Sequence, residues 1–213
     1  MVTYSQLSEL CHKDFDARHL AREEALTHSR LLTRHSAQAI RAIHRNERDL
    51  ADEELNQCRE LVESIKSNLA PFPDLFFSGY TQDAIKEYAE ARLTYCMVLD
   101  LDLPTPAEMD VEVATYLRGM AEAAGELRRR CLDILRKGYS GEAERLLAHM
   151  DEIFAVLMTM DYPDAITYGL RHQSDQLRGI IERTRADLTI SLREHTLQQA
   201  LIDFEKKLPP GTA

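Results

Sequence analysis

The chain has 213 residues, of which 44% are hydrophobic and 29% are charged, enough to form a buried core within one compact unit. With 26 Lys and Arg against 36 Asp and Glu the net charge is −10, which argues against polyanion binding by the surface as a whole. Nucleic acid would bind only where basic residues are gathered in one place.

The predicted elements are helices separated by clusters of glycine and proline. These clusters lie at 71–79, 104–106, 138–141, 163 and 209–211. The stretches 4–48 and 49–70 contain neither residue and are rich in Ala, Leu, Glu and Arg, which favour helix. They predict two helices or one long broken helix.

The later helices carry capping signals. Residues 105–108 (Thr-Pro-Ala-Glu) have the pattern of a capping box with proline at the first helical position, which predicts a helix start. Ser140 is expected to cap a shorter helix that ends near Met160, and residues 161–164 to open a last long helix. No segment has a pattern that favours a β-strand over these helices. The sequence therefore predicts an all-α fold, a single-domain antiparallel bundle of six or seven helices over residues 1–213.

Cysteine spacing and hydropathy further narrow the class of protein to which the chain could belong. The four cysteines are far apart and form no C-x-x-C pair, which predicts neither a zinc site nor a disulfide framework. No apolar run approaches the roughly 18 residues that a spanning helix needs, and the first residues lack a signal-peptide core. We therefore expect a cytoplasmic protein. Motifs for nucleotide binding, serine hydrolysis and zinc proteolysis do not occur.

Acidic residues share one face of the helix expected after Gly79. Asp83, Glu87 and Glu90 stand at i, i+4 and i+7, so they fall within a narrow stripe. Carboxylate oxygens are the ligands that Mg²⁺ or Mn²⁺ prefers. The alternative is a solvated acidic face, and spacing alone favours that alternative.

A second acidic pair, Glu122 and Glu126, stands at i and i+4 on the following helix. Small residues occupy most positions from Gly119 to Gly125, although a mid-helix glycine costs about 1 kcal/mol against alanine. The best explanation is another helix that passes very close and brings acidic residues together. The alternative is a set of exposed ion pairs worth a few tenths of a kcal/mol.

A stripe of arginines about 60° wide is expected on the first long helix, from the helical spacing of its members. They are Arg30, Arg34, Arg41, Arg45 and Arg48. Such a stripe could bind phosphates, face solvent or pair with acidic residues of a neighbour. His35 and His44 lie off the stripe and are expected to be packing or surface residues.

Four segments in chain order carry a wider resemblance. They are residues 29–45 (SRLLTRHSAQAIRAIHR), 86–91 (KEYAEA), 113–129 (VATYLRGMAEAAGELRR) and the DLT that starts at 187. Together they resemble the translin family, and most of all its Trax branch and prokaryotic homologues. In that branch an E-Y-x-E-A segment and a G-x-x-D-x-x-G-E-L segment supply the acidic residues of a magnesium-dependent endoribonuclease. The order of all four segments makes the resemblance more specific than either motif alone.

The resemblance implies a role for each acidic residue. Glu90 and Glu126 would be the metal ligands for Mg²⁺ or Mn²⁺, and Glu87 and Glu122 would complete the catalytic set. The family's aspartate is Glu122 here, one methylene longer, which could alter the metal geometry and weaken activity. The sister branch, translin itself, binds nucleic acid but lacks this acidic set, so the retained glutamates favour the nuclease branch.

The family also implies a homo-oligomer, usually an octamer, that encloses an interior where RNA binds. A negative outer surface is compatible with this if the arginines face inward. The expected RNA-binding residues are Arg30, Arg34, Arg41 and Arg45. The leading hypothesis is a metal-dependent endoribonuclease acting on single-stranded or short duplex RNA. The alternatives are a non-catalytic assembly that binds single-stranded RNA or DNA, and a helical scaffold with no nucleic-acid role.

Overall fold

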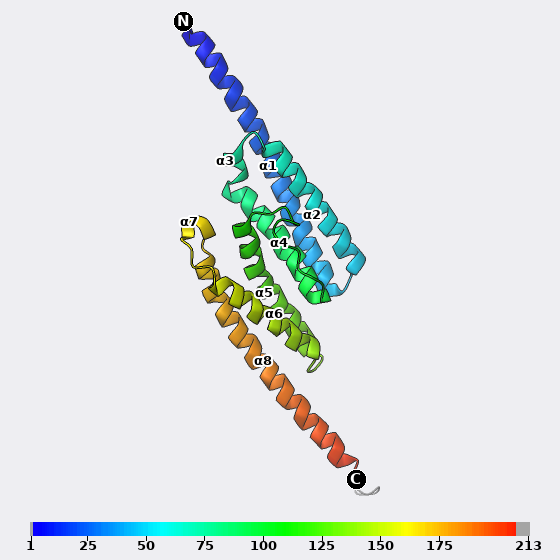
Figure 1. Cartoon of the computed structure of the whole chain (residues 1–213). Helices are drawn as coiled ribbons and strands as arrows, with labels where there is room; N and C mark the ends of the chain where they lie inside the picture. Colours follow the sequence, from blue (N-terminus) through cyan, green and yellow to red (C-terminus); the bar gives the residue numbers. More distant parts are fainter. Residues whose placement is uncertain (1, 208–213) are drawn as a thin grey trace. The chain divides into compact units, whose positions relative to one another are not determined.

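The computed structural model describes residues 2–207, which form helices and no strand. The six long helices are α1 (Tyr4–Arg45), α2 (Arg48–Leu69), α4 (Gly79–Leu99), α5 (Val113–Leu135), α6 (Gly141–Met158) and α8 (Leu170–Glu205), and two four-residue helices are α3 (Pro73–Phe76) and α7 (Asp164–Thr167) (Figure 1). The all-α prediction is confirmed. Within the described range, no helix combines the length and apolar character needed to cross a bilayer.

The chain packs as two compact units. The first comprises residues 2–96 and 102–120, and the second residues 97–101 and 121–207. A compact unit is not by itself an independently folding domain, so the single-domain organisation stays a prediction.

In the first unit, α1 and α2 lie side by side as a helical pair (Figure 1). The chain reverses at Asn46, whose φ of 60° is in the left-handed region and ends α1. Apolar side chains such as Leu32 of α1 and Ile65 of α2 are fully buried. The first turns of α1 extend past α2, and their side chains are exposed. The sequence predicted either two helices or one long broken helix here, and the structure has two separate helices.

Helix α4 is surrounded by other residues over most of its circumference. Ile85, Ala91 and Leu93 point in different directions around the helix axis, yet each is at most 1% exposed. A helix that is buried all round belongs to the interior of a fold. Charged side chains on α4 therefore need a specific explanation.

In the second unit, α6 packs against α8. Ser140 caps α6 as predicted, because its hydroxyl accepts a hydrogen bond from the backbone N–H of Glu142 at 3.2 Å. Arg145 of α6 donates to the carbonyl oxygens of Met97 at 2.6 Å and Val98 at 3.0 Å. These carbonyls lie at the end of α4, where a helix has no backbone donors left for them.

Two predicted helix starts lie elsewhere. The capping box at Thr105 and Glu108 forms, with the Thr105 N–H donating to the Glu108 carboxylate at 2.8 Å. It closes only a turn, however, because Asp110 has a φ of 54°, and α5 begins at Val113. Similarly, the helix that opens at Asp164 stops at Tyr168, which has a φ of 51°, and α8 starts afresh.

The four cysteines are free thiols, and all but Cys11 are buried. Burial raises the pKa of Cys58 and of Cys131 to about 11. Buried thiols of raised pKa are inert packing groups, since the thiolate is the reactive and metal-binding form.

Candidate metal centre

Gly119 of α5 lies directly against α4. A Cβ atom at this position would be 2.7 Å from the Ala89 Cβ, 2.9 Å from the Glu90 nitrogen and 2.9 Å from the Lys86 oxygen. Two of these three atoms belong to the backbone, so the helices approach as closely as glycine permits. The prediction of a closely passing helix is confirmed at Gly119. It is wrong for Gly125, where an added Cβ would meet no atom within 4 Å.

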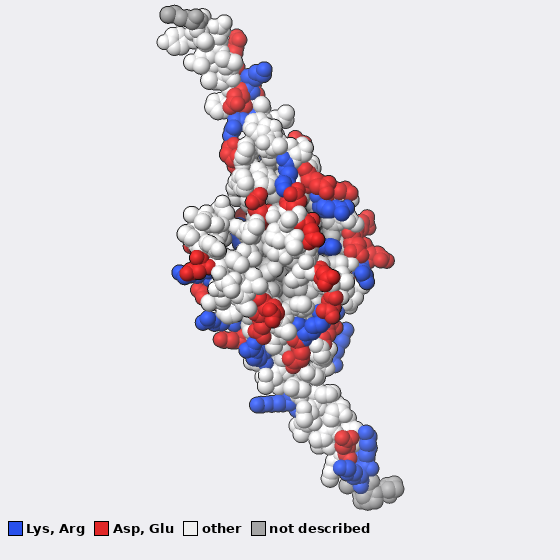
Figure 2. Space-filling model, in the orientation of Figure 1, with Lys and Arg blue, Asp and Glu red and all other residues white. Residues whose placement is uncertain are grey.

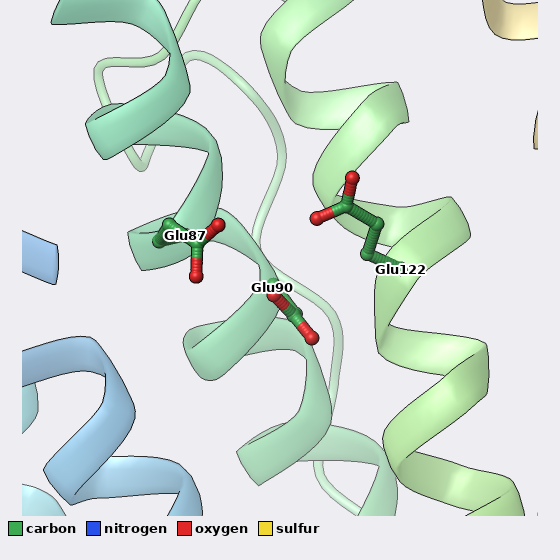
Figure 3. Close-up of side chains that lie close together, drawn as sticks. All are labelled: Glu87, Glu90 and Glu122. Atoms are coloured by element: carbon green, nitrogen blue, oxygen red, sulfur yellow. The ribbon is translucent and has the colours of Figure 1, made fainter. Parts of the chain in front are cut away.

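Three carboxylates gather beside this contact. Glu87 and Glu90 come from α4, and Glu122 lies about one helical turn beyond Gly119 on α5 (Figure 3). Each offers one oxygen, and these oxygens all lie within 4.8 Å of one another. All three side chains are half-buried. Their arrangement differs from a solvated acidic face, in which carboxylates point separately into water.

Like charges at this spacing repel one another. At 4.8 Å two carboxylates repel by roughly 3 kcal/mol when the effective dielectric constant is about 20. Lys86 offsets part of this repulsion, since its Nζ lies 3.2 Å from Glu87 and its side chain is only 11% exposed. A divalent cation would offset far more, and an all-oxygen donor set of this kind fits Mg²⁺ or Mn²⁺.

The other acidic residues on these helices have partners of their own. Asp83 accepts a hydrogen bond from Arg118 at 2.9 Å. Glu126 forms an ion pair with Arg129 at 3.5 Å and is not part of the three-carboxylate group. The structure thus brings together three of the four predicted site glutamates, and Glu126 lies one turn further along α5.

Gln173 of α8 was missed by sequence analysis. Its side-chain nitrogen donates to an oxygen of Glu122 at 3.1 Å. The two residues are 51 positions apart, and Gln173 belongs to no motif. Lys86, by contrast, is the first residue of the K-E-Y-A-E-A segment and could have been included from the sequence.

The arginine stripe is exposed on α1. It consists of Arg30, Arg34, Arg41 and Arg45. Within residues 2–207 none of these four guanidinium groups has an ion-pair partner, whereas Arg48 begins α2 and pairs with Asp52 at 3.9 Å. Arg48 therefore does not extend the stripe. On the face seen in Figure 2, basic and acidic side chains alternate and form no continuous basic patch.

His35 and His44 were predicted to be packing or surface residues, and the structure shows the surroundings of each. The Nδ1 of His35 lies 2.6 Å from a carboxylate oxygen of Glu54, so His35 joins α1 to α2 as a packing residue. His44 is half-buried near the end of α1. Neither residue belongs to the carboxylate group.

Comparison with known proteins places the chain in a family. No protein-family model matches it. An uncharacterized protein of Methanocaldococcus jannaschii is 35% identical over 181 residues, which are 82% of this chain and 80% of that protein. A structure of AfC3PO with duplex RNA is 33% identical, with a TM-score of 0.81 over 87% of this chain and 96% of that one.

A structure of apo-NeC3PO is 19% identical, with a TM-score of 0.79 over 90% of this chain and all of that one, and it supports the fold alone. Both C3PO proteins have the all-helical translin fold. The chain belongs to the translin family.

Proposed function

We propose that the protein is a metal-dependent endoribonuclease that acts on single-stranded or short duplex RNA. The observation that carries this proposal is the half-buried group of Glu87, Glu90 and Glu122, held together at the Gly119 contact. Three carboxylates on an otherwise buried helix pair are costly for folding alone and suit a cation site. RNA as the ligand is supported by AfC3PO, which is similar over most of its length and forms a complex with duplex RNA.

The ligands would come from both helices. Glu122 points from α5 toward α4, where Glu87 and Glu90 lie one turn apart (Figure 3). Glu126, which family resemblance makes a ligand, would act beside them once its carboxylate leaves Arg129. A bound Mg²⁺ or Mn²⁺ would activate a water and neutralise charge on the phosphodiester.

The protein's own groups would prepare the site for this chemistry. Lys86 limits repulsion among the carboxylates before a cation binds, because its ammonium group is already beside Glu87. The Gly119 contact fixes the separation of the two helix backbones, so little reorganisation is needed. The exposed arginines Arg30, Arg34, Arg41 and Arg45 would bind the RNA backbone through its phosphates.

We also propose that the protein forms a homo-oligomer. Ile190, Leu197, Leu201 and Phe204 follow one another at i, i+7, i+11 and i+14 on α8, which places them in one stripe. Each is more than half exposed. An apolar stripe of this kind is suited to a second copy of the chain, and the octamer implied by resemblance would cover it.

The decisive experiment compares Glu90→Gln with the wild type. The variant keeps the shape of the side chain but loses its charge, so we expect Mn²⁺-dependent cleavage of labelled single-stranded RNA to disappear. RNA affinity and oligomeric mass should stay the same. Glu60→Gln is a matched control, since Glu60 is exposed on α2 and has no partner within residues 2–207.

Undiminished cleavage by Glu90→Gln would refute the assigned site. RNA binding without any Mn²⁺-dependent cleavage by the wild type would instead select the non-catalytic alternative, an assembly that binds RNA or single-stranded DNA. Absence of salt-dependent RNA affinity would select the scaffold alternative.

A further inference from the structure

The Gln173 side chain has one satisfied and one unsatisfied end. Its nitrogen donates to Glu122, as described above, at 3.1 Å. Its oxygen is buried from solvent and accepts no hydrogen bond from any residue that the structure describes. Buried amide oxygens nearly always have a partner, so this oxygen calls for an explanation.

The explanation lies in the symmetry of the amide group. A half-turn about the last side-chain bond exchanges the oxygen and the nitrogen, and both orientations fill the same space. In the turned orientation, the Gln173 oxygen would take the place now held by its nitrogen, beside the Glu122 carboxylate. Two oxygens cannot share a hydrogen bond there, but they can share a cation.

The distance fits that arrangement. Adjacent oxygens around an octahedral Mg²⁺, each about 2.1 Å from the ion, are roughly 3 Å apart. The observed separation of the Gln173 and Glu122 side-chain atoms is 3.1 Å. Side-chain amide oxygens are common neutral ligands of hard cations. A neutral ligand also adds no further repulsion to a group that already holds three carboxylates.

We propose that Gln173 is a further metal ligand, whose amide oxygen binds the same divalent cation as Glu122. This inference rests on the proposed metal site. Without the cation, the Gln173 amide donates to Glu122 and holds that long carboxylate in place. With the cation, the amide turns and its oxygen becomes a ligand, while its nitrogen takes the place that the oxygen held before.

The test is a calorimetric titration of the full chain with Mn²⁺ alone, in the absence of RNA. We expect Gln173→Ala to weaken Mn²⁺ binding about tenfold or more, the effect typical of losing a residue that holds or orients a metal ligand. Gln176→Ala is the matched control. It lies on the same helix, bonds to His172 and is exposed, so Mn²⁺ affinity should not change.

Gln173→Glu separates a ligand from a simple hydrogen-bond donor. A carboxylate cannot donate to Glu122 but can bind a cation, so this variant should regain Mn²⁺ affinity at least equal to that of the wild type. Its melting temperature should be lower than that of the wild type without Mn²⁺ and should rise more when Mn²⁺ is added. The same melting curves show whether each variant is folded.

Each outcome has a definite meaning. If Gln173→Ala binds Mn²⁺ as tightly as the wild type, the inference is wrong while the metal site stands. If Gln173→Glu is as weak as Gln173→Ala, Gln173 is a donor and not a ligand, and the inference is again wrong. If the wild type itself binds no Mn²⁺, the metal site of the proposed function fails first, and the role of Gln173 fails with it.

Discussion

Gly119 is the residue on which the proposed metal site depends most, although it carries no functional group. Its missing side chain lets the backbone of α5 reach the Ala89–Glu90 segment of α4. Because Glu122 follows about one turn later on the same helix, the position of its carboxylate depends on this contact. A substitution here acts on site geometry without removing a ligand.

The first prediction concerns Gly119→Ala. The new Cβ would lie within 3 Å of the Glu90 nitrogen and the Lys86 oxygen, and neither backbone atom can move aside cheaply. We expect the free energy of unfolding to fall by about 1–3 kcal/mol, as for other overpacked cores. Mn²⁺ affinity should fall as well. Chemical denaturation and metal titration measure the two effects.

Gly125→Ala is the control on the same helix. Nothing lies within 4 Å of an added Cβ there, so alanine should stabilise the helix by roughly 0.5–1 kcal/mol. If both substitutions stabilise the protein, the close approach at Gly119 is wrong.

Part of the site could be predicted from the sequence. The i and i+3 spacing of Glu87 and Glu90 places them on one helix face, and resemblance adds Glu122. The arrangement departs from that prediction at Glu126, where Arg129 lies three residues further on the same helix and pairs with it. Gln173 could not be found, because its contact depends on how α8 packs and no spacing rule links residues so far apart.

At the scale of elements, the end of α4 is held by a side chain from α6. Arg145 caps two carbonyl oxygens there and also donates to Asp100 at 3.2 Å. His149 lies one turn further along α6, with its Nε2 at 3.4 Å from Arg145 and 3.9 Å from Asp100. The charges of Arg145 and Asp100 therefore affect the pKa of His149.

The second prediction is a dependence of stability on pH. Burial, and then the positive charge of Arg145, lowers the pKa of His149, while Asp100 and Glu152 raise it by less. The neutral form is thus favoured in the folded state. Its contribution to stability is complete above the ordinary histidine pKa of about 6.5 and is lost as the pH falls through the lower folded value.

We therefore expect the free energy of unfolding to decrease between about pH 7 and pH 5, and to decrease less steeply in His149→Gln. His19→Gln, at an exposed position of α1, serves as the control. Urea denaturation across this pH range measures the slopes. Equal slopes for the wild type and His149→Gln would contradict the prediction.

Helix existence was easier to predict than helix ends. The long stretches free of glycine and proline became helices, and Ser140 caps α6 where its hydroxyl indicated. The ends depend on residues in the left-handed region, namely Asn46, Asp110 and Tyr168. Such conformations have no strong signal in non-glycine residues, so the Thr105 capping box was mistaken for the start of a long helix.

At the scale of the whole molecule, RNA binding depends on how the charges are distributed as well as on the net charge. The net charge of −10 disfavours RNA binding, yet the four exposed arginines of α1 form a local basic stripe. Attraction to phosphates is local at physiological salt, where charges more than about 8 Å away are screened. The stripe can therefore act independently of the acidic remainder.

The third prediction follows from this stripe. We expect the double substitution Arg34→Gln and Arg41→Gln to weaken binding of single-stranded RNA. It should also reduce the slope of log affinity against log salt by about 0.7 for each lost phosphate contact. The control is the double substitution Arg136→Gln and Arg193→Gln, at exposed positions of the second unit. Its net charge equals that of the first double variant. Identical salt slopes for the two double variants would exclude the stripe as the RNA contact.

The exposed apolar stripe of α8 has a consequence for how this protein would respond to dilution. If other copies cover Ile190, Leu197, Leu201 and Phe204, the last turns of α8 are stabilised by mass action and not by their own chain. An isolated helix of only a few turns is marginally stable in water. Subunit concentration would then set how much of α8 is folded, and with it the temperature at which the protein melts.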